Sequence, residues 1–496
     1  MEIQNLPNDT EELKNLLINQ KKVLNNLQLE NDRLREDLQL LRRRKFAPTS
    51  EKDDSQTTLF NEAEDIEYKE EEDKETKTVT YERSIKNKIK PLPDHLHRVE
   101  EIIDIPEEDK IGMKCIGEEV VEKLEITPAK VFVKRIIKKK YAPLDKGSGN
   151  FKIADYKHDL MPKSMASASL LAYIIVSKYE DALPLYRQEK IFNRIKAEIP
   201  RQTMARWLIQ LHFKLIPLYN LMQEVALERD YCQIDETTTQ VLKEDGKKAT
   251  SKSYAWVRYF PGYEPITLFD YAPTRSGDVP VELLEGFEGY LQCDGYIGYD
   301  KICRDKKITR LGCWDHCRRK FFDASKTSSG KGVGKKGLDL IKKLYKIEDR
   351  IRELPPDQKY QIRQQESVLV LDKLNQFIDE TREKISPAST GGKAINYAYN
   401  EWQNLINYTK EGKLRISNIL VENAIRPFAI GRKNWLFSTS VDGAHASMMY
   451  YSLIETAKNN GLEPFDYLNK MLYKLPLAKA VEDFEKLLPL KDHFQV

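Results

Sequence analysis

The apolar residues of this chain change their spacing at about residue 230, and this change limits the folds open to it. Residues 160–228 carry the period of helices. Five short segments with the period of strands follow, and a helix is expected in VPVELLEGF, between the third and the fourth. The first three segments predict a meander, and the whole pattern indicates a mixed sheet in an α/β layer fold. The five segments are YCQID, SYAWVRYF, PITLFDYA, GYLQCD and ITRLGCWDH.

Two of these predicted strands end in an aspartate. Asp235 closes the first and Asp294 the fourth, so both carboxylates would meet at one edge if these strands are neighbours. A third acid, Glu422, lies in a helical segment whose Ile419 and Ile425 are expected to face the core. Carboxylate oxygens are ligands that Mg²⁺ prefers, and two such ions can stabilise both oxygens of a phosphodiester displacement. Aspartates that only form turns at strand ends are the alternative.

Basic residues follow these acids along the chain. Positive charge beside a metal site is typical of a surface that contacts a phosphate backbone. The spacing of Glu422 and Arg426 is also that of an exposed, structurally optional ion pair on a helix. The candidate DNA-binding residues of this part are Arg318, Arg319, Lys320, Arg426, Arg432 and Lys433.

Two further segments contain candidate DNA contacts. Arg201 lies in PRQT, which resembles the entry to the second helix of a helix-turn-helix with Thr203 as a candidate N-cap. A pair of helices in an ordinary bundle is the alternative. Residues 96–148 indicate a small β unit with a basic segment, whose cations either hold phosphates or protect a strand edge. Its candidate residues are Lys138, Lys139 and Lys140.

The leucines of the N-terminal segment recur in a heptad pattern. Residues 13–41 place Asn31 at a seam position, a usual means of fixing the register of a two-stranded coiled coil. The pattern therefore predicts a parallel homodimer, and an amphipathic helix packed on its own chain is the alternative. The acidic segment that follows, to about residue 95, lacks an apolar period and predicts a flexible linker.

Composition excludes several classes of protein. The 81 Lys and Arg residues against 78 Asp and Glu give a net charge of +3, so any surface for nucleic acid must be local. The longest mostly apolar stretch, residues 166–176, is too short to span a membrane, and we expect a cytoplasmic protein. Six cysteines are too few for a disulfide scaffold and are expected to be reduced thiols.

Eight ordered stretches of the chain resemble the landmarks of bacterial insertion-sequence sixty-six transposases. The resemblance extends over some 450 residues, which makes it far more specific than an isolated acidic triplet. The stretches are LRRRKFAPTSEK, LPLYRQEKIF, PRQTMARW, QIDETTTQVL, LQCDGYIGYD, GCWDHCRRKFFDA, VENAIRPFAIGRKNWLFSTS and YSLIETAKNNGLEPFDYL.

This resemblance implies a DDE transposase with a ribonuclease H-like core. By position Asp235, Asp294 and Glu422 would be the catalytic and metal-binding acids, holding two Mg²⁺ or Mn²⁺ ions. Water would cut the transposon end, and the exposed 3′ hydroxyl would attack target DNA without a covalent protein intermediate. Trp314 and His316 would lie beside the site, although a packed aromatic ring and a satisfied imidazole are the plainer interpretations. The implied partners are DNA, a second copy of the chain and companion proteins of the same element, at the bacterial nucleoid.

The family resemblance also implies a small zinc-binding domain, and here the chain departs from the pattern. The family's zinc site needs four cysteine thiolates, whereas residues 96–148 contain Cys115 as their only cysteine. We therefore expect no structural zinc in that segment. Cys313, His316 and Cys317 lie close together in the sequence but lack a fourth partner nearby.

The expected fold class is therefore multidomain α/β. Two other functions stay open: a catalytically silent DNA-binding protein, and a nuclease that cuts without joining. The expected parts are a coiled coil (1–45), an acidic linker (46–95), a small basic β domain (96–148), a helical DNA-binding region (149–228), the first part of a ribonuclease H-like core (229–325), a helical insertion (326–415), the Glu-bearing helix of the core (416–445) and a C-terminal helical tail (446–496).

Overall fold

The computed structural model describes residues 131–141, 152–304, 307–327, 332–492 and 494, together with the helical residues 11, 14, 17–24, 27 and 31. The chain divides into one unit of residues 1–53 and 138–496 and another of residues 54–137. In the second unit only residues 131–137 are described, as an exposed segment without regular structure. The positions described between 11 and 31 are helical, as the heptads predict. The whole linker, and all of the small β domain except residues 131–141, lie outside the described residues.

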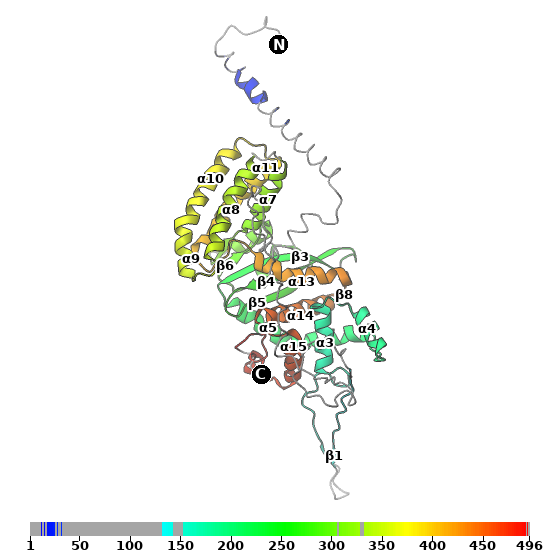
Figure 1. Ribbon diagram of the computed structural model, residues 1–496. Coiled ribbons are helices and arrows are strands. Elements are labelled where there is room, and N and C mark those ends of the chain that lie inside the picture. Colours follow the sequence, from blue (N-terminus) through cyan, green and yellow to red (C-terminus); the bar gives the residue numbers. More distant parts are fainter. Residues whose placement is uncertain are drawn as a thin grey trace, which may run out of the picture. The chain divides into compact units, whose positions relative to one another are not determined.

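A mixed sheet with the strand order β5-β4-β3-β6-β7 forms the centre of the first unit (Figure 1). Its first three strands are an antiparallel meander, while β6 and β7 run parallel to β3. All five predicted strands are present, and the first and fourth are neighbours as expected. The strands are β3 (Tyr231–Lys243), β4 (Lys252–Phe260), β5 (Ile266–Ala272), β6 (Gly289–Gln292), β7 (Ile308–Leu311) and β8 (Ser438–Ser440), the last of which pairs with the far end of β3. A separate two-stranded pair joins β1 (Lys140–Tyr141) to β2 (Lys152–Ile153).

The expectation that Asp235 ends its strand is wrong. β3 continues to Lys243 because its pairing with β4 extends well beyond the aspartate. The parallel pairing with β6, however, stops at Gln233 opposite Gln292. Asp235 therefore lies just beyond the end of the β3–β6 ladder, and Asp294 lies just beyond the end of β6.

Three helices precede the sheet, as the 3.6-residue period predicts: α3 (Ala168–Tyr179), α4 (Leu185–Arg194) and α5 (Arg201–Leu227). Thr203 is not the N-cap of α5, because the helix already begins at Arg201 after Pro200, whose fixed φ suits that position. A buried stripe of α5 shares the hydrophobic core of the sheet. The Tyr219 hydroxyl of α5 also donates to Asp270 of β5 at 2.8 Å.

Helix α14 (Val441–Asn459) covers the open edge of the sheet at β5 and is almost entirely buried. Two of its hydroxyls replace the missing strand partner. The backbone N–H of Phe269 donates to Ser452 Oγ at 2.7 Å, and that of Thr267 donates to Thr456 Oγ1 at 3.0 Å. The expected boundary between residues 445 and 446 falls inside this helix. α15 (Pro464–Lys474), the short helix η8 (Leu475–Leu477) and α16 (Val481–Glu485) follow it.

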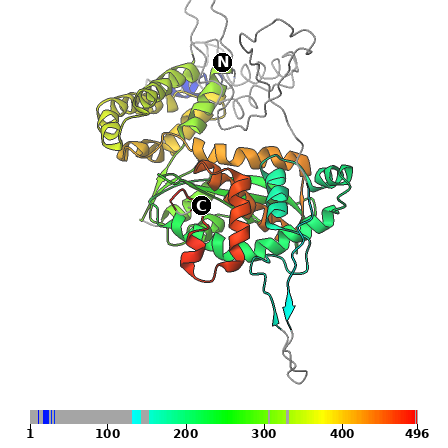
Figure 2. The ribbon, with the colours of Figure 1, turned by 60° about the horizontal axis from the view of Figure 1, so that its bottom comes forward.

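The segment between the fifth strand and residue 415 is helical, as predicted (Figure 2). Together with α7 it builds a second hydrophobic core. Trp314, at the start of α7, is fully buried in this core and donates its indole N–H to the Leu405 carbonyl at 2.9 Å. The helices are α7 (Trp314–Thr327), α8 (Val333–Ile351), α9 (Pro356–Ile362), α10 (Val368–Arg382), α11 (Thr390–Asn400) and α12 (Trp402–Ile406), with η6 (Arg363–Ser367) and η7 (Asn407–Lys410).

Helix α13 (Ile419–Trp435) lies across the sheet against β3 and β4 (Figure 1). Its buried stripe includes Val421, Ala424 and Phe428. As expected, Ile425 packs against the core, although it is only partly buried. Ile419 is also partly buried but does not belong to this core, so the expectation that it faces the core is wrong. The remaining short elements are α6 (Asp278–Leu283), η4 (Ile297–Asp300) and η5 (Ile302–Arg304). Among the described helices, none is both long and apolar enough to cross a membrane.

The burial of Glu455 in α14 leads us to expect that the free energy of unfolding depends on pH. Burial raises the pKa of Glu455 to about 6, and the nearby Lys458 ammonium only partly offsets this effect. Because the folded state holds the proton more tightly, the free energy of unfolding falls as pH rises from about 4.5 to 6, by on the order of 2 kcal/mol. Glu455→Gln removes this loss, so its unfolding temperature relative to wild type is expected to rise between pH 4.5 and 7. Parallel curves for the two proteins would contradict the prediction.

Candidate active site

The structure brings the three predicted acids together from distant parts of the chain. Asp235 lies on β3, Asp294 follows β6, and Glu422 lies in the first turn of α13. Burial raises the pKa of Asp235 well above its usual value, and the charges of Glu236, Glu422 and Asp294 raise it further. Four carboxylates therefore lie within one electrostatic environment.

A buried polar cluster, the glutamine anchor (Tyr231, Gln233 and Gln292), holds the start of α13 against the two strands. Gln233 Nε2 donates to Gln292 Oε1 at 2.8 Å, and Tyr231 Oη donates to the same oxygen at 2.5 Å. Gln233 Nε2 also donates to the Ser417 carbonyl at 3.2 Å, and Gln233 Oε1 accepts the backbone N–H of Val421 at 3.2 Å. Glu422 follows Val421 directly, so the anchor positions Glu422 relative to Asp235 and Asp294.

His316 lies beside Glu422, as its sequence position implied. Its Nδ1 is 3.7 Å from Glu422 Oε1, and within the described part of the chain this buried nitrogen has no hydrogen-bond partner. The Cys313 sulfur joins them, since the three ligating atoms lie within 4.8 Å of one another. Burial raises the pKa of the Cys313 thiol well above its usual value, so without a cation this sulfur is a neutral thiol. Cys317 is not part of this cluster.

The sequence analysis missed a fourth carboxylate and the residues bound to it. The side chain of Glu236 is only 2% exposed, and it accepts hydrogen bonds from Arg275 and from the Tyr299 hydroxyl. The sequence contained a signal for Glu236. An Asp-Glu pair within a buried strand places at least one carboxylate where it needs a partner. The sequence contained no such signal for Arg275, because this residue lies in a loop after the third strand.

The predicted cations differ in their surroundings. Arg432 is held by β3, because its Nη1 donates to Thr237 Oγ1 at 2.9 Å and to the Thr238 carbonyl. The Nε atom of Arg318 lies 3.8 Å from the Oδ1 atom of Asp315. Arg319 and Arg426 are partly buried. The exposed cations are Lys138, Lys139, Lys140, Arg201, Lys320 and Lys433.

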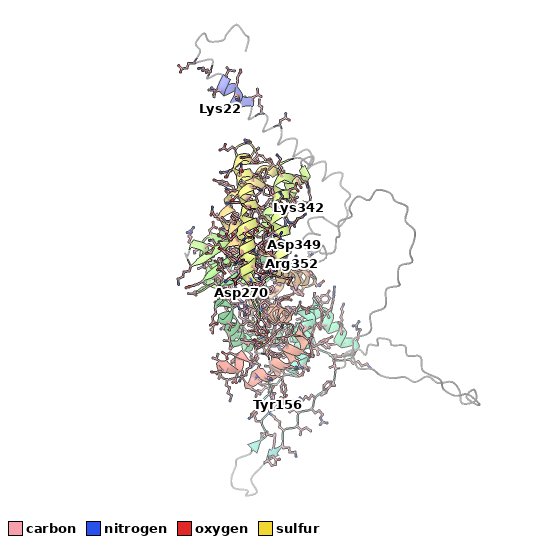
Figure 3. All side chains as sticks on the ribbon, turned by 60° about the vertical axis from the view of Figure 1, so that its left-hand side comes forward. Lys22, Tyr156, Asp270, Lys342, Asp349 and Arg352 are labelled. Atoms are coloured by element: carbon pink, nitrogen blue, oxygen red, sulfur yellow. The ribbon has the colours of Figure 1, made fainter. Side chains whose placement is uncertain are left out.

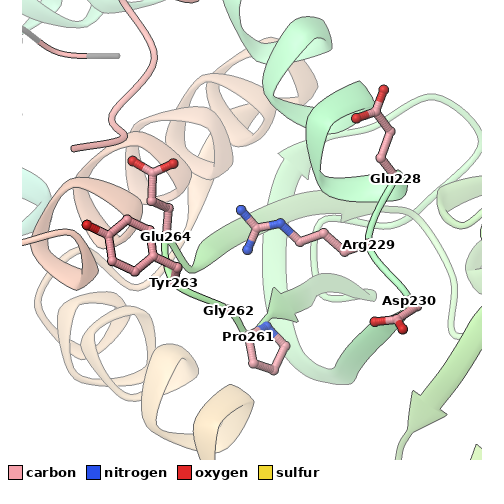
Figure 4. A pocket seen from close by; sticks show the side chains of 7 residues that line it. All are labelled: Glu228, Arg229, Asp230, Pro261, Gly262, Tyr263 and Glu264. Atoms are coloured by element: carbon pink, nitrogen blue, oxygen red, sulfur yellow. The ribbon is translucent and has the colours of Figure 1, made fainter. Parts of the chain in front are cut away.

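An open hollow lies at the amino end of β3, lined by residues 228–230 and 261–264 (Figure 4). Arg229 crosses it and donates to the Phe260 carbonyl at 3.2 Å. None of the candidate catalytic residues lines this hollow, so it is distinct from the acidic site.

The acidic site suits a hard divalent cation. Asp235 is partly buried beside three other carboxylates, and without positive charge its ionised form is strongly disfavoured. Carboxylate oxygens from three elements match the ligands that Mg²⁺ and Mn²⁺ take. The donor set therefore fits such an ion.

Comparison with known proteins shows what this chain is related to. Residues 163–446 match the family described as Transposase IS66 family, and residues 452–490 match the IS66 C-terminal element. Residues 33–100 match Transposase C of IS166 homeodomain, a match that includes the whole predicted linker. Two similar proteins come from Sinorhizobium fredii (strain NBRC 101917 / NGR234). Uncharacterized protein y4qI is 33% identical over 80% of this chain and 76% of its own length, and Uncharacterized protein y4jD is 30% identical over 80% and 81%.

The chain is thus a transposase, a DNA-processing enzyme of mobile elements. It belongs to the IS66 family of insertion-sequence transposases. Membership implies DNA binding and a function in DNA transposition, and transposases of the DDE type generally use divalent metal ions.

We expect that breaking the glutamine anchor causes a defect in DNA cleavage that lost stability alone would not explain. Gln233→Met removes the acceptor of the Val421 N–H and two donors at nearly constant volume. The buried Ser417 carbonyl loses its donor, and α13 loses its side-chain bonds to β3. This is expected to cost about 1–3 kcal/mol and to lower DNA cleavage by more than the loss of folded protein. Cleavage measured well below the unfolding temperature, together with thermal unfolding, checks this.

Gln240→Met is the matched control, because Gln240 lies on the same strand and its side-chain amide donates to the Ala249 carbonyl, away from α13. An anchor variant with wild-type cleavage would contradict the positioning role.

Proposed function

We propose that this protein is a DDE transposase that cleaves DNA at the ends of its insertion sequence and joins those ends to target DNA. The supporting observation is that Asp235, partly buried on β3, lies among the charges of Asp294 and Glu422, which come from two other parts of the chain. Such a cluster destabilises the folded protein, so its presence indicates that it has a function.

The sheet supports a ribonuclease H-like core for this activity. Its first and fourth strands are parallel neighbours, and the helix with the third acid packs on the first strand. In this proposal the core comprises residues 229–325 and 416–445, and the helices of residues 326–415 are an insertion. Residues 1–45, 46–95, 96–148, 149–228 and 446–496 keep their expected roles as coiled coil, linker, small basic domain, helical DNA-binding region and C-terminal piece.

Asp235, Asp294 and Glu422 would hold two Mg²⁺ or Mn²⁺ ions, whose chemistry is to activate the attacking hydroxyl and to stabilise the leaving oxygen. The protein's own contribution is position: the glutamine anchor sets Glu422 against the two strands. His316 is a secondary candidate beside Glu422. Trp314 supports that region through its buried bond to the Leu405 carbonyl.

The surroundings supply candidate contacts to the DNA backbone. Positive side chains bind phosphate and release counterions, which gives affinity without sequence preference. Arg432 would act indirectly, by fixing the β3 segment that follows the acids. The proposed direct contacts are Lys138, Lys139, Lys140, Arg201, Arg318, Arg319, Lys320, Arg426 and Lys433. The partners proposed with DNA are a second copy of the chain, bound through residues 13–41, and companion proteins of the same element.

The test is metal-dependent cleavage and joining of DNA that carries the element's ends. Asp235→Asn, Asp294→Asn and Glu422→Gln each remove one ligand charge while nearly preserving shape. Because a metal contributes several kcal/mol to such a reaction, each change is expected to lower both activities by about 100-fold or more. Gel analysis of nicked and joined products measures the effect.

Asp323→Asn is the control, an exposed aspartate on α7 outside the acidic cluster, and it is expected to behave as wild type. Products that are nicked but never joined would favour the nuclease. Binding without any cleavage, even when the companion proteins are added, would favour the silent DNA-binding protein and contradict the proposal.

A further inference from the structure

Arg275 is held rigidly at the acidic site, on the loop between β5 and α6. Its Nε and Nη2 both reach Glu236 Oε1. Its guanidinium carbon lies 3.8 Å from the centre of the Tyr296 ring, and its carbonyl accepts the Tyr296 hydroxyl at 2.6 Å. Carboxylate, aromatic ring and backbone therefore fix this side chain before any substrate arrives.

The same contacts connect Arg275 to two of the proposed catalytic acids. Glu236 directly follows Asp235, and the backbone N–H of Tyr296 donates to Asp294 Oδ1 at 2.9 Å. Burial alone would lower the pKa of Arg275, but the charges of Glu236 and Asp294 raise it above the usual value. A permanent cation therefore lies next to the acids.

Glu236 differs from the three acids proposed to bind metal, because both of its carboxylate oxygens already accept hydrogen bonds from the protein. Its Oε1 accepts from Arg275 and its Oε2 accepts from the Tyr299 hydroxyl. With both oxygens occupied, Glu236 serves to position Arg275. It is therefore a positioning residue, in contrast to the three acids proposed to hold metal.

The arginine itself stays accessible. Its side chain is 40% exposed, whereas that of Glu236 is 2% exposed. A guanidinium has five N–H donors in a planar fork, and Glu236 uses only one edge of it. The other donors can bind phosphate oxygens, and a preorganised donor loses little conformational freedom when it does so.

We propose that Arg275 binds a phosphate of the DNA strand next to the bond that is cut, and that Glu236 and Tyr296 hold it in place. This inference rests on the proposed function. The alternative is a purely structural ion pair that locks the loop after β5. The two differ in whether the positive charge of Arg275 contributes to the salt dependence of DNA binding.

The experiment measures fluorescence anisotropy of the full-length protein with a labelled duplex of the element's end, in Ca²⁺ and over a range of salt. Arg275→Gln is expected to weaken binding by about tenfold and to reduce the slope of log affinity against log salt by about one. Arg275→Lys keeps the charge without the planar fork, so the slope is expected to return while part of the affinity loss persists.

Two further variants make the result specific. Glu236→Gln breaks the ion pair but keeps the cation, so its salt slope is expected to match wild type. Arg352→Gln removes an exposed arginine directly after α8, whose Nη2 lies 2.6 Å from Asp349 Oδ1 (Figure 3), and it is expected to change neither affinity nor slope. Thermal unfolding of each variant reports any loss of structure.

Two results would establish the structural lock. One is an unchanged salt slope in Arg275→Gln. The other is an equal loss of DNA affinity in Arg275→Gln and Glu236→Gln that follows their lowered unfolding temperatures. Either result would overturn this inference and leave the proposed function standing. A wild-type protein that binds no DNA, with or without the companion proteins, would overturn the proposed function and the inference with it.

Discussion

The arrangement of the site depends on a small buried hydrogen-bond network between two parallel strands and one helix. Gln233 of β3 and Gln292 of β6 bond to each other and to the backbone that leads into α13. Buried amides without partners are costly, so the network is stable only when helix and strands take one relative position. Because Asp235, Asp294 and Glu422 lie within a few residues of these partners, the same constraint brings the acids together.

Concentrating acids in this way opposes folding, and the structure offsets part of the cost locally. Glu236 is neutralised by Arg275 and bonded by Tyr299, which leaves Asp235 as the partly buried carboxylate with the least compensation. In the proposed function divalent metal completes the charge balance, and Arg275 adds a fixed cation on the side of the substrate. Strain that persists in a folded protein is often retained because the active site uses it.

Periodicity was enough to predict the five strands and the meander, because each strand is bounded by turn residues. That the first and fourth strands are neighbours was a condition taken from ribonuclease H-like sheets, which periodicity alone does not supply. It could not predict that β3 extends past Asp235, since residues 236–240 are polar and their pairing with β4 depends on tertiary contacts. The family resemblance selected three acids that the fold brings together, whereas Arg275 and the glutamine anchor had no local signal. Their partners lie tens to nearly 190 residues away, a separation at which one sequence carries no pairing information.

The central claim is that Asp235, Asp294 and Glu422 share bound metal, and iron-directed cleavage of the polypeptide tests it most directly. Fe²⁺ bound in place of Mg²⁺ generates hydroxyl radicals with ascorbate and peroxide, which cut the backbone close to the ion. The account predicts cuts near residues 235, 294 and 422 together, competed by Mg²⁺ and all lost in Asp235→Asn. Cuts at only one of these places, or cuts that persist in Asp235→Asn, would contradict it.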